Sequence, residues 1–219
     1  MKYQHEQKES VHPKDSINTE APPAPLREQW ALDMMKEYLE GRGLSYERAI
    51  ANGCYPIDKK GYRVFIPSRS RVSSHVYWQS RAMDPDNRLR WDSPPTPRRD
   101  ALVVMFGPLR DKTGIDRLVI VEGPMDALAV ASLDLHIGIG LMGINPTQEA
   151  LDHVCSYIQC FSPREVVCVC DRDQIAGMCK IQSYLAMRGY MSKLVIPLAH
   201  KDIACYTLKQ REEILRGNQ

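Results

Sequence analysis

The chain has 219 residues, which is enough for one large domain or two small ones with a sizeable hydrophobic core. Hydrophobic residues make up 43% and charged residues 26%, as in ordinary globular proteins, and no apolar run approaches the about 20 residues of a membrane-spanning helix. The net charge of +2 is unevenly distributed, because residues 59–113 alone carry twelve basic and five acidic side chains, an excess that is expected to face a polyanion.

The N-terminal half is predicted to hold a tail, two helices and a small sheet. Residues 1–25 are polar and end in a proline-rich run, so we expect a disordered tail. Helical spacing of apolar residues predicts a helix over 26–41, and a second short helix is predicted over 45–51. Alternating residues at 62–66 and 75–78 predict strands, and the proline-rich and arginine-rich stretch 84–100 predicts an extended basic loop.

From residue 116 the pattern changes to alternating strands and helices. Continuous apolar runs predict buried strands at 118–121, 136–141, 166–170 and 193–196. Helices are predicted between them at 125–133, 147–160 and 174–188. Such alternation is typical of a parallel sheet with right-handed crossovers, so the chain is expected to have an α/β fold.

Seven cysteines with irregular spacing indicate reduced thiols, and we therefore expect a cytoplasmic protein. The polar N-terminus does not resemble a secretory signal. Cys-x-x-Cys pairs do not occur in the sequence, so no zinc is expected in this chain.

Acidic residues follow two of the predicted strands. Glu122 comes after the first strand, and Asp171 and Asp173 come after the third, where alternation places them on one side about 7 Å apart. Each acid alone could cap a helix, but clustered carboxylates repel one another unless a divalent cation lies among them. Together with Asp126 and Asp202, they predict a magnesium site at the carboxyl ends of the strands.

These motifs resemble a known family. Residues 121–128 (VEGPMDAL) and 170–177 (CDRDQIAG) resemble the two signature motifs of the TOPRIM domain, which is found in bacterial-type primases, topoisomerases and certain nucleases. Both motifs are most similar to those of bacterial-type and phage primases. The resemblance extends over residues 26–215, and the basic stretch 62–107 resembles the segment that precedes the TOPRIM domain in primases.

The resemblance implies a TOPRIM parallel-sheet domain at 114–219, preceded by a small mixed α+β basic subdomain at 26–113. It further implies a DNA primase core that synthesises short RNA primers on single-stranded DNA by metal-dependent nucleotidyl transfer. Catalysis is expected from Glu122, Asp171 and Asp173, which would hold Mg²⁺ or Mn²⁺ with help from Asp126 and Asp202.

Basic and aromatic residues are expected to hold the template strand or the nucleotide phosphates. Arg81 and Arg90 match basic residues of the family, and Trp91 lies among arginines, where it could stack on an unpaired base. Packing in the core is the alternative for Trp91 and is favoured for Trp78. The remaining candidates are Arg69, Arg71, Arg98, Arg99 and Lys201.

The family usually also carries a zinc ribbon and a helicase-binding domain. We expect partner proteins, a replicative helicase or a separate zinc-binding protein, to supply these functions in a bacterial or phage-infected cell. The small size favours a phage-encoded protein. Two other functions remain open: a TOPRIM nuclease that uses the same metals, and a non-catalytic single-stranded-DNA-binding module of the replisome.

Overall fold

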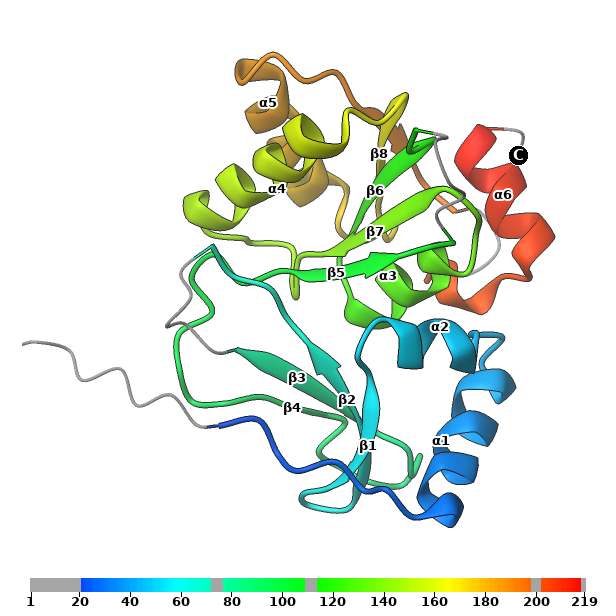
Figure 1. The fold of residues 1–219 in the computed structure, drawn as a ribbon. Coiled ribbons are helices and arrows are strands. Elements are labelled where there is room, and N and C mark those ends of the chain that lie inside the picture. Colours follow the sequence, from blue (N-terminus) through cyan, green and yellow to red (C-terminus); the bar gives the residue numbers. More distant parts are fainter. Residues whose placement is uncertain (1–20, 72–76, 109–113, 198–201, 218–219) are drawn as a thin grey trace, which may run out of the picture.

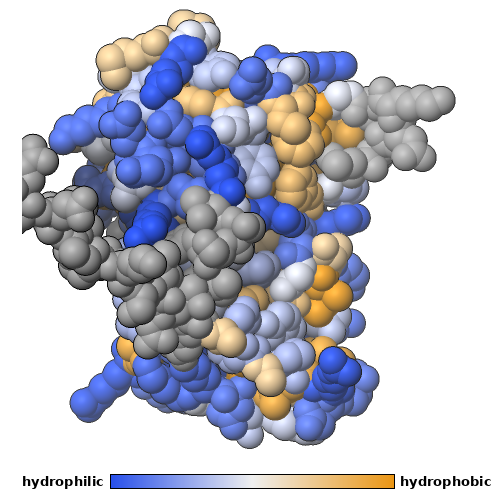
Figure 2. All heavy atoms as spheres, turned by 60° about the vertical axis from the view of Figure 1, so that its left-hand side comes forward, coloured by the Kyte–Doolittle hydropathy of each residue, from blue (hydrophilic) through white to orange (hydrophobic). Residues whose placement is uncertain are grey.

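The computed structural model describes residues 21–71, 77–108, 114–197 and 202–217. Two sheets form the body of the protein, and the chain builds the four-stranded sheet before the five-stranded one (Figure 1). Within the described ranges, no helix is both long and apolar enough to cross a membrane. On the side shown in Figure 2, hydrophilic residues predominate and hydrophobic atoms lie in small separate groups.

Two helices and an antiparallel sheet form the N-terminal part. Ser45 ends the connection between the helices and caps the second one, since its side chain accepts a hydrogen bond from the Arg48 N–H at 3.2 Å. The four strands pair in chain order, each antiparallel to the next. The elements are α1 (Gln29–Gly41), α2 (Tyr46–Ala51), β1 (Tyr55–Asp58), β2 (Tyr62–Pro67), β3 (Trp78–Ala82) and β4 (Trp91–Asp92).

The second sheet has the strand order β5-β7-β6-β8-β9. The last four of these are parallel to one another, and β5 pairs with β7 in the antiparallel direction. Its strands are β5 (Val103–Phe106), β6 (Arg117–Val121), β7 (His136–Gly140), β8 (Glu165–Val169) and β9 (Lys193–Val195), and its helices are α3 (Pro124–Ala131), α4 (Gln148–Phe161), α5 (Ile175–Met187), the 3₁₀ turn η1 (Ile203–Cys205) and α6 (Leu208–Arg216).

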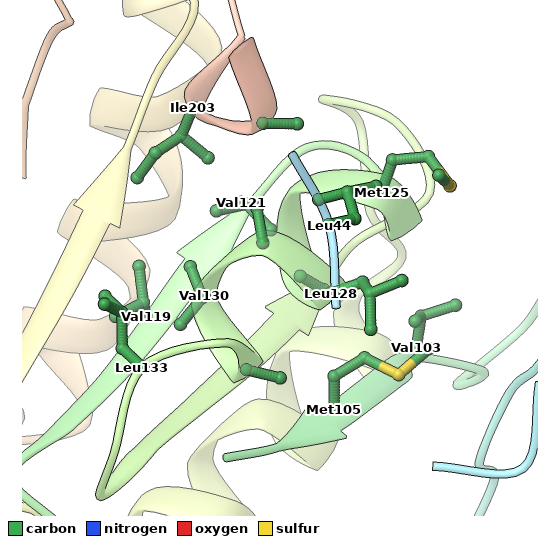
Figure 3. Close-up of a cluster of buried hydrophobic side chains, with 14 of the residues drawn as sticks. Leu44, Val103, Met105, Val119, Val121, Met125, Leu128, Val130, Leu133 and Ile203 are labelled. Carbon is green, nitrogen blue, oxygen red and sulfur yellow. The ribbon is translucent and has the colours of Figure 1, made fainter. Parts of the chain in front are cut away.

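The two faces of the second sheet have separate cores, because successive strand side chains point to opposite faces. Leu118 and Ile120 of β6 belong to the core beneath α4 and α5, whereas Val119 and Val121 belong to the core that contains α3. Leu44, from the connection between α1 and α2, also lies in the α3 core, close to Met125 and Leu128 in Figure 3. The N-terminal helices are therefore packed into the same core as the second sheet.

Close packing of α3 on β7 depends on two glycines. A Cβ atom added at Gly138 would overlap with the backbone of Ala127, and one added at Gly140 would lie 2.9 Å from the carbonyl oxygen of Gly123. The sequence HIGIG therefore presents isoleucines to the α4 face and bare backbone to α3. This close approach fixes the position of the N-terminal end of α3, which carries Asp126 and comes just after Glu122.

The predicted α/β fold is confirmed, and every predicted helix and every strand from 116 onward has a counterpart within a few residues. Several features differ from the prediction. Neither η1 nor α6, at the C-terminal end of the described chain, was predicted. The second sheet is mixed and not wholly parallel, because β5 was not predicted and joins as an antiparallel edge strand. The first sheet also contains the unpredicted β1, and the proline-rich stretch 84–100 contains the two-residue strand β4.

The domain boundary proposed at 113/114 stays a prediction, and so does the tail at 1–25, of which residues 1–20 lie outside the described residues. Part of the strand predicted at 75–78 also lies outside them, and β3 begins at Trp78 and runs on to Ala82. All seven cysteines are described, and each has a free thiol, as the irregular spacing predicted.

Candidate functional site

Glu122 and Asp171 follow neighbouring strands. Strands β6 and β8 are adjacent and parallel, with Ile120 paired with Cys168, so continuing this register places Glu122 level with Cys170. The chain then turns after β8, where the N–H of Gln174 donates to the carbonyl oxygen of Asp171 at 2.9 Å. Asp173 lies in this turn and is exposed, whereas Glu122 and Asp171 are half-buried. The expected placement of Glu122 and Asp171 at adjacent strand ends is confirmed. The expected extended segment that would put Asp173 on the same side as Asp171 is wrong, because the chain turns there.

Asp126 is brought to the same place by the first turn of α3. Gly123 precedes the helix and Pro124 is its first residue, a combination that suits a helix start. A Cβ atom on Gly123 would lie only 2.8 Å from Oδ2 of Asp126, so glycine leaves room for this carboxylate. Its Oδ1 accepts a hydrogen bond of 3.2 Å from the N–H of Ala204, two residues after Asp202.

The pKa of Asp126 shows how the acids repel one another. It is raised from 3.8 to about 7, mainly because burial disfavours the charged form and next because of the negative charge of Asp202. The charges of Asp171 and Glu122 raise it further, against the lowering effect of the hydrogen bond from Ala204. Asp126 therefore lies within electrostatic reach of three of the other four predicted acids.

A buried arginine supports this acidic cluster. Arg211 of α6 has no exposed surface, and it donates hydrogen bonds to the carbonyl oxygens of Ile203 at 3.2 Å, Ala204 at 2.8 Å and Gly43 at 3.0 Å. Burial lowers the pKa of its guanidinium, and the charge of Asp126 acts in the opposite direction. Arg211 therefore fixes the turn that follows Asp202 and ties it to the end of α1.

The chemistry of these side chains fits a hard divalent cation, because carboxylate oxygens are the ligands that Mg²⁺ and Mn²⁺ prefer. In the part of the chain that the structure describes, however, no three histidine, cysteine, aspartate or glutamate side chains are grouped closely enough to hold a metal as they stand. Binding would require rotation of the partly exposed Glu122, Asp171 or Asp173 side chains. The metal site stays a prediction.

Most of the predicted nucleic-acid-binding residues fall into two groups. Arg81 and Trp91 are direct partners on β3 and β4, and the guanidinium lies over the indole ring, 5.0 Å from its centre. Arg90 precedes Trp91 and is exposed. Trp91 is half-buried and packs against the core, whereas Trp78 is fully buried, as was favoured for it. Lys201 lies outside the described residues.

The second group lies about a cavity beside α4. Arg71, Arg98 and Arg99 are among its lining residues. Arg98 donates to the carbonyl oxygens of Met142 and, at 2.9 Å, Asn145 in the loop after β7. Arg69 belongs to neither group, because its guanidinium lies over the ring of Phe106, 5.5 Å from its centre.

Sequence reasoning missed two residues that shape these sites. Asp100 accepts hydrogen bonds from Ser70 and from the Arg71 N–H, contacts between residues about thirty positions apart that no local pattern reveals. Arg211 occupies an amphipathic helix whose pattern gives no sign that a charged residue faces the core. An arginine on the apolar face of this helix could have been noticed only after the helix and its buried face were known.

Comparisons with known proteins agree with this geometry at the level of the fold. No protein-family model matches the chain, and neither does any curated protein. Two solved structures of the RNA polymerase domain of Mycobacterium tuberculosis primase DnaG resemble it. The domain in complex with double-stranded DNA has a TM-score of 0.56 at 15% identity, covering 84% of this chain and 73% of that one. The other structure of that domain has a TM-score of 0.57 at 16% identity, covering 88% and 76%. The chain therefore has a primase-like fold that extends across both of its sheets.

Proposed function

We propose that this protein is the polymerising core of a DNA primase of the TOPRIM type, which synthesises short RNA primers on single-stranded DNA. The observation that carries the proposal is the cluster of acids at the ends of β6 and β8, where burial and, after it, the charges of Asp202, Asp171 and Glu122 raise the pKa of Asp126. The acidic cluster and the basic N-terminal part lie in one chain whose fold resembles that of a primase RNA polymerase domain.

Nucleotidyl transfer needs positioning and neutralisation of phosphate charge more than it needs covalent chemistry by the protein. Mg²⁺ or Mn²⁺ held by Glu122, Asp171 and Asp173 would stabilise the charge that develops on the reacting phosphate. Asp202 and, when ionised, Asp126 add negative charge near Asp171 and Glu122, which favours occupancy by a divalent cation. Arg211 holds the turn that follows Asp202 in place.

The template strand is proposed to run along β3 and β4. Arg81 and Arg90 would contact phosphates, and the indole of Trp91, already covered on one side by Arg81, would contact an unpaired base. Phosphate contacts make binding salt-dependent, because each one releases a counterion. Replacing Arg81 and Arg90 by alanine is therefore expected to weaken binding to single-stranded DNA and to lower the slope of log K against log salt by about one to two.

Primer synthesis tests the proposal directly. The protein is incubated with single-stranded DNA, labelled ribonucleotides and Mg²⁺ or Mn²⁺, with and without a replicative helicase and a zinc-binding partner. Asp171→Asn/Asp173→Asn should abolish synthesis, and Asp86→Asn, an exposed aspartate away from the acidic cluster, should retain it. Absence of primers under every condition, or full activity of the double variant, would contradict the proposal.

The same assay separates the alternatives. Metal-dependent degradation of the DNA without incorporation of nucleotides would favour a nuclease. DNA binding that is indifferent to metal and to the acidic substitutions would favour a non-catalytic replisome module. In a cell, a primase core is expected to act at the replication fork in the cytoplasm of a bacterium or a phage-infected host.

A further inference from the structure

The cavity beside α4 is separate from both the acidic cluster and the Arg81–Trp91 pair. Its volume is about 940 Å³, within the range of small-molecule sites. One wall comes from the N-terminal part of the chain and the other from the first turns of α4. Its lining residues are Arg71, Tyr77, Arg98, Arg99, Asp100 and Glu149, with Pro97, Thr147 and Asp152.

Several contacts fix the walls of this cavity. Thr147 caps α4, accepting from the Ala150 N–H at 3.1 Å, and its hydroxyl donates to the carbonyl oxygen of Arg99 at 2.7 Å. Asp100 accepts from Ser70 Oγ at 2.5 Å and from the Arg71 N–H at 2.7 Å. Burial raises the pKa of Asp100, but these hydrogen bonds outweigh burial and lower it, so the carboxylate is ionised. The cavity is thus held open by contacts that exist before any ligand arrives.

The charges around the cavity favour an anion. Asp152 is paired with Arg188 at 2.8 Å, and Asp100 is occupied by its two donors. Arg71 and Arg99 are exposed, and in the described ranges neither guanidinium contacts a carboxylate. Two exposed guanidinium groups that are not paired with carboxylates in the described ranges can bind phosphate groups, because the planar guanidinium matches the geometry of phosphate oxygens.

The remaining lining residues favour a mononucleotide over a nucleic-acid strand. Exposed Glu149 would repel a continuous phosphate backbone, whereas its carboxylate can accept hydrogen bonds from sugar hydroxyls. Tyr77 offers a ring for contact with a base. We propose that this cavity binds a ribonucleoside triphosphate, with its phosphates on Arg71 and Arg99 and its ribose towards Glu149; the choice of nucleotide as ligand rests on the proposed function.

The loop after β7 connects this cavity to the acidic cluster. Arg98 binds the carbonyl oxygen of Met142, and the N–H of the next residue, Gly143, donates to the carbonyl oxygen of Glu122 at 3.2 Å. A nucleotide in the cavity would therefore lie against the same loop that contacts the backbone of a predicted catalytic residue. Its binding does not require the acids or a metal, and this allows a separate test.

Fluorescence anisotropy with a labelled GTP in EDTA excludes metal-dependent binding, since without metal the acidic cluster repels a triphosphate. A cavity variant and a control variant then separate binding in the cavity from binding by other exposed arginines. Arg71→Ala/Arg99→Gly should weaken binding at least about tenfold. Arg99 has a φ of +46°, which glycine adopts readily, so the double variant should fold. Arg27→Ala/Arg88→Ala removes two exposed arginines outside the cavity and should leave binding unchanged.

Two further measurements complete the test. Glu149→Gln should reduce the preference for GTP over dGTP, and unlabelled oligo(dT) should not displace the nucleotide. The proposal is overturned if the wild type does not bind in EDTA, if the cavity variant binds as well as the control variant, or if oligo(dT) competes. Failure of primer synthesis with nucleotide binding intact would contradict the proposed function and leave this site standing.

Discussion

Replacing Arg211 by methionine removes a buried cation whose hydrogen bonds within the described residues all go to backbone carbonyls. Methionine keeps the length and much of the volume of the side chain, so packing changes little. The three carbonyl oxygens, of Gly43, Ile203 and Ala204, would lose a donor. These carbonyls belong to the α1–α2 connection and to η1, which are 160 positions or more apart in the sequence. The substitution therefore removes the hydrogen bonds by which Arg211 links these two regions.

The size of the effect follows from two opposing contributions. Each hydrogen bond from a charged group contributes about 1.5–3 kcal/mol, so three give about 5–9 kcal/mol. Removing the buried charge returns several kcal/mol of desolvation cost. The free energy of unfolding is therefore expected to fall by about 2–4 kcal/mol. This is a large part of the free energy of unfolding of a typical domain, about 5–15 kcal/mol.

Urea unfolding, followed by circular dichroism and tryptophan fluorescence, measures this loss. With a slope of about 2 kcal/mol per molar urea, the midpoint should fall by about 1–2 M. The control is Arg216→Met on the same helix, an exposed arginine paired with Glu212, which should change stability by less than about 0.5 kcal/mol. A midpoint for Arg211→Met equal to that of the control, or above the wild type, would refute the assigned role.

Three further predictions concern the packing of α3 and the acidic cluster. Gly138→Ala should destabilise the protein by about 1–3 kcal/mol in the same assay, because its Cβ meets backbone, whereas Gly41→Ala, with open space around it, should not. In EDTA, Asp126→Asn should stabilise the protein at pH 8, and this stabilisation should become smaller towards pH 5. The pKa of Asp126 is about 7 in the folded protein and 3.8 in the unfolded chain, so the stability of the wild type falls as the pH rises through this window. A difference in stability that does not depend on pH would contradict this prediction. Adding Mg²⁺ or Mn²⁺ should raise the melting temperature of the wild type but not of Asp171→Asn/Asp173→Asn, and equal shifts would argue against these ligands.

The sequence predicted those parts of the fold that depend on local pattern. Continuous apolar runs identified β6 and β8, and the rule that ligands lie at the carboxyl ends of parallel strands placed Glu122 and Asp171 at neighbouring strand ends. The sequence did not predict the strand order, and the structure shows that these two strands are adjacent. Most boundaries differed by one or two residues, as is usual where helix ends fray. Larger differences occur at the start of α1, which begins three residues later than predicted, and at β3, which runs from Trp78 to Ala82.

Long-range contacts account for what was missed. Strand β5 is a short apolar run whose partner, β7, lies about 35 residues further on and runs in the opposite direction. The division of the basic residues into two groups also depends on tertiary contacts, since Arg81 is fixed by strand pairing and Arg98 by the loop after β7. Neither the pairing of β5 nor the grouping of these arginines can be predicted from charge or spacing alone.

The edge position of β5 has a consequence for how the protein can be divided. A break between residues 113 and 114 would leave β5 with the N-terminal fragment and expose the hydrogen-bonding edge of β7 on the other. Such an unpaired edge is a template for pairing with further chains. The C-terminal fragment alone is therefore expected to aggregate, whereas a fragment that starts before residue 101 would keep its protective strand and be the better choice for expression.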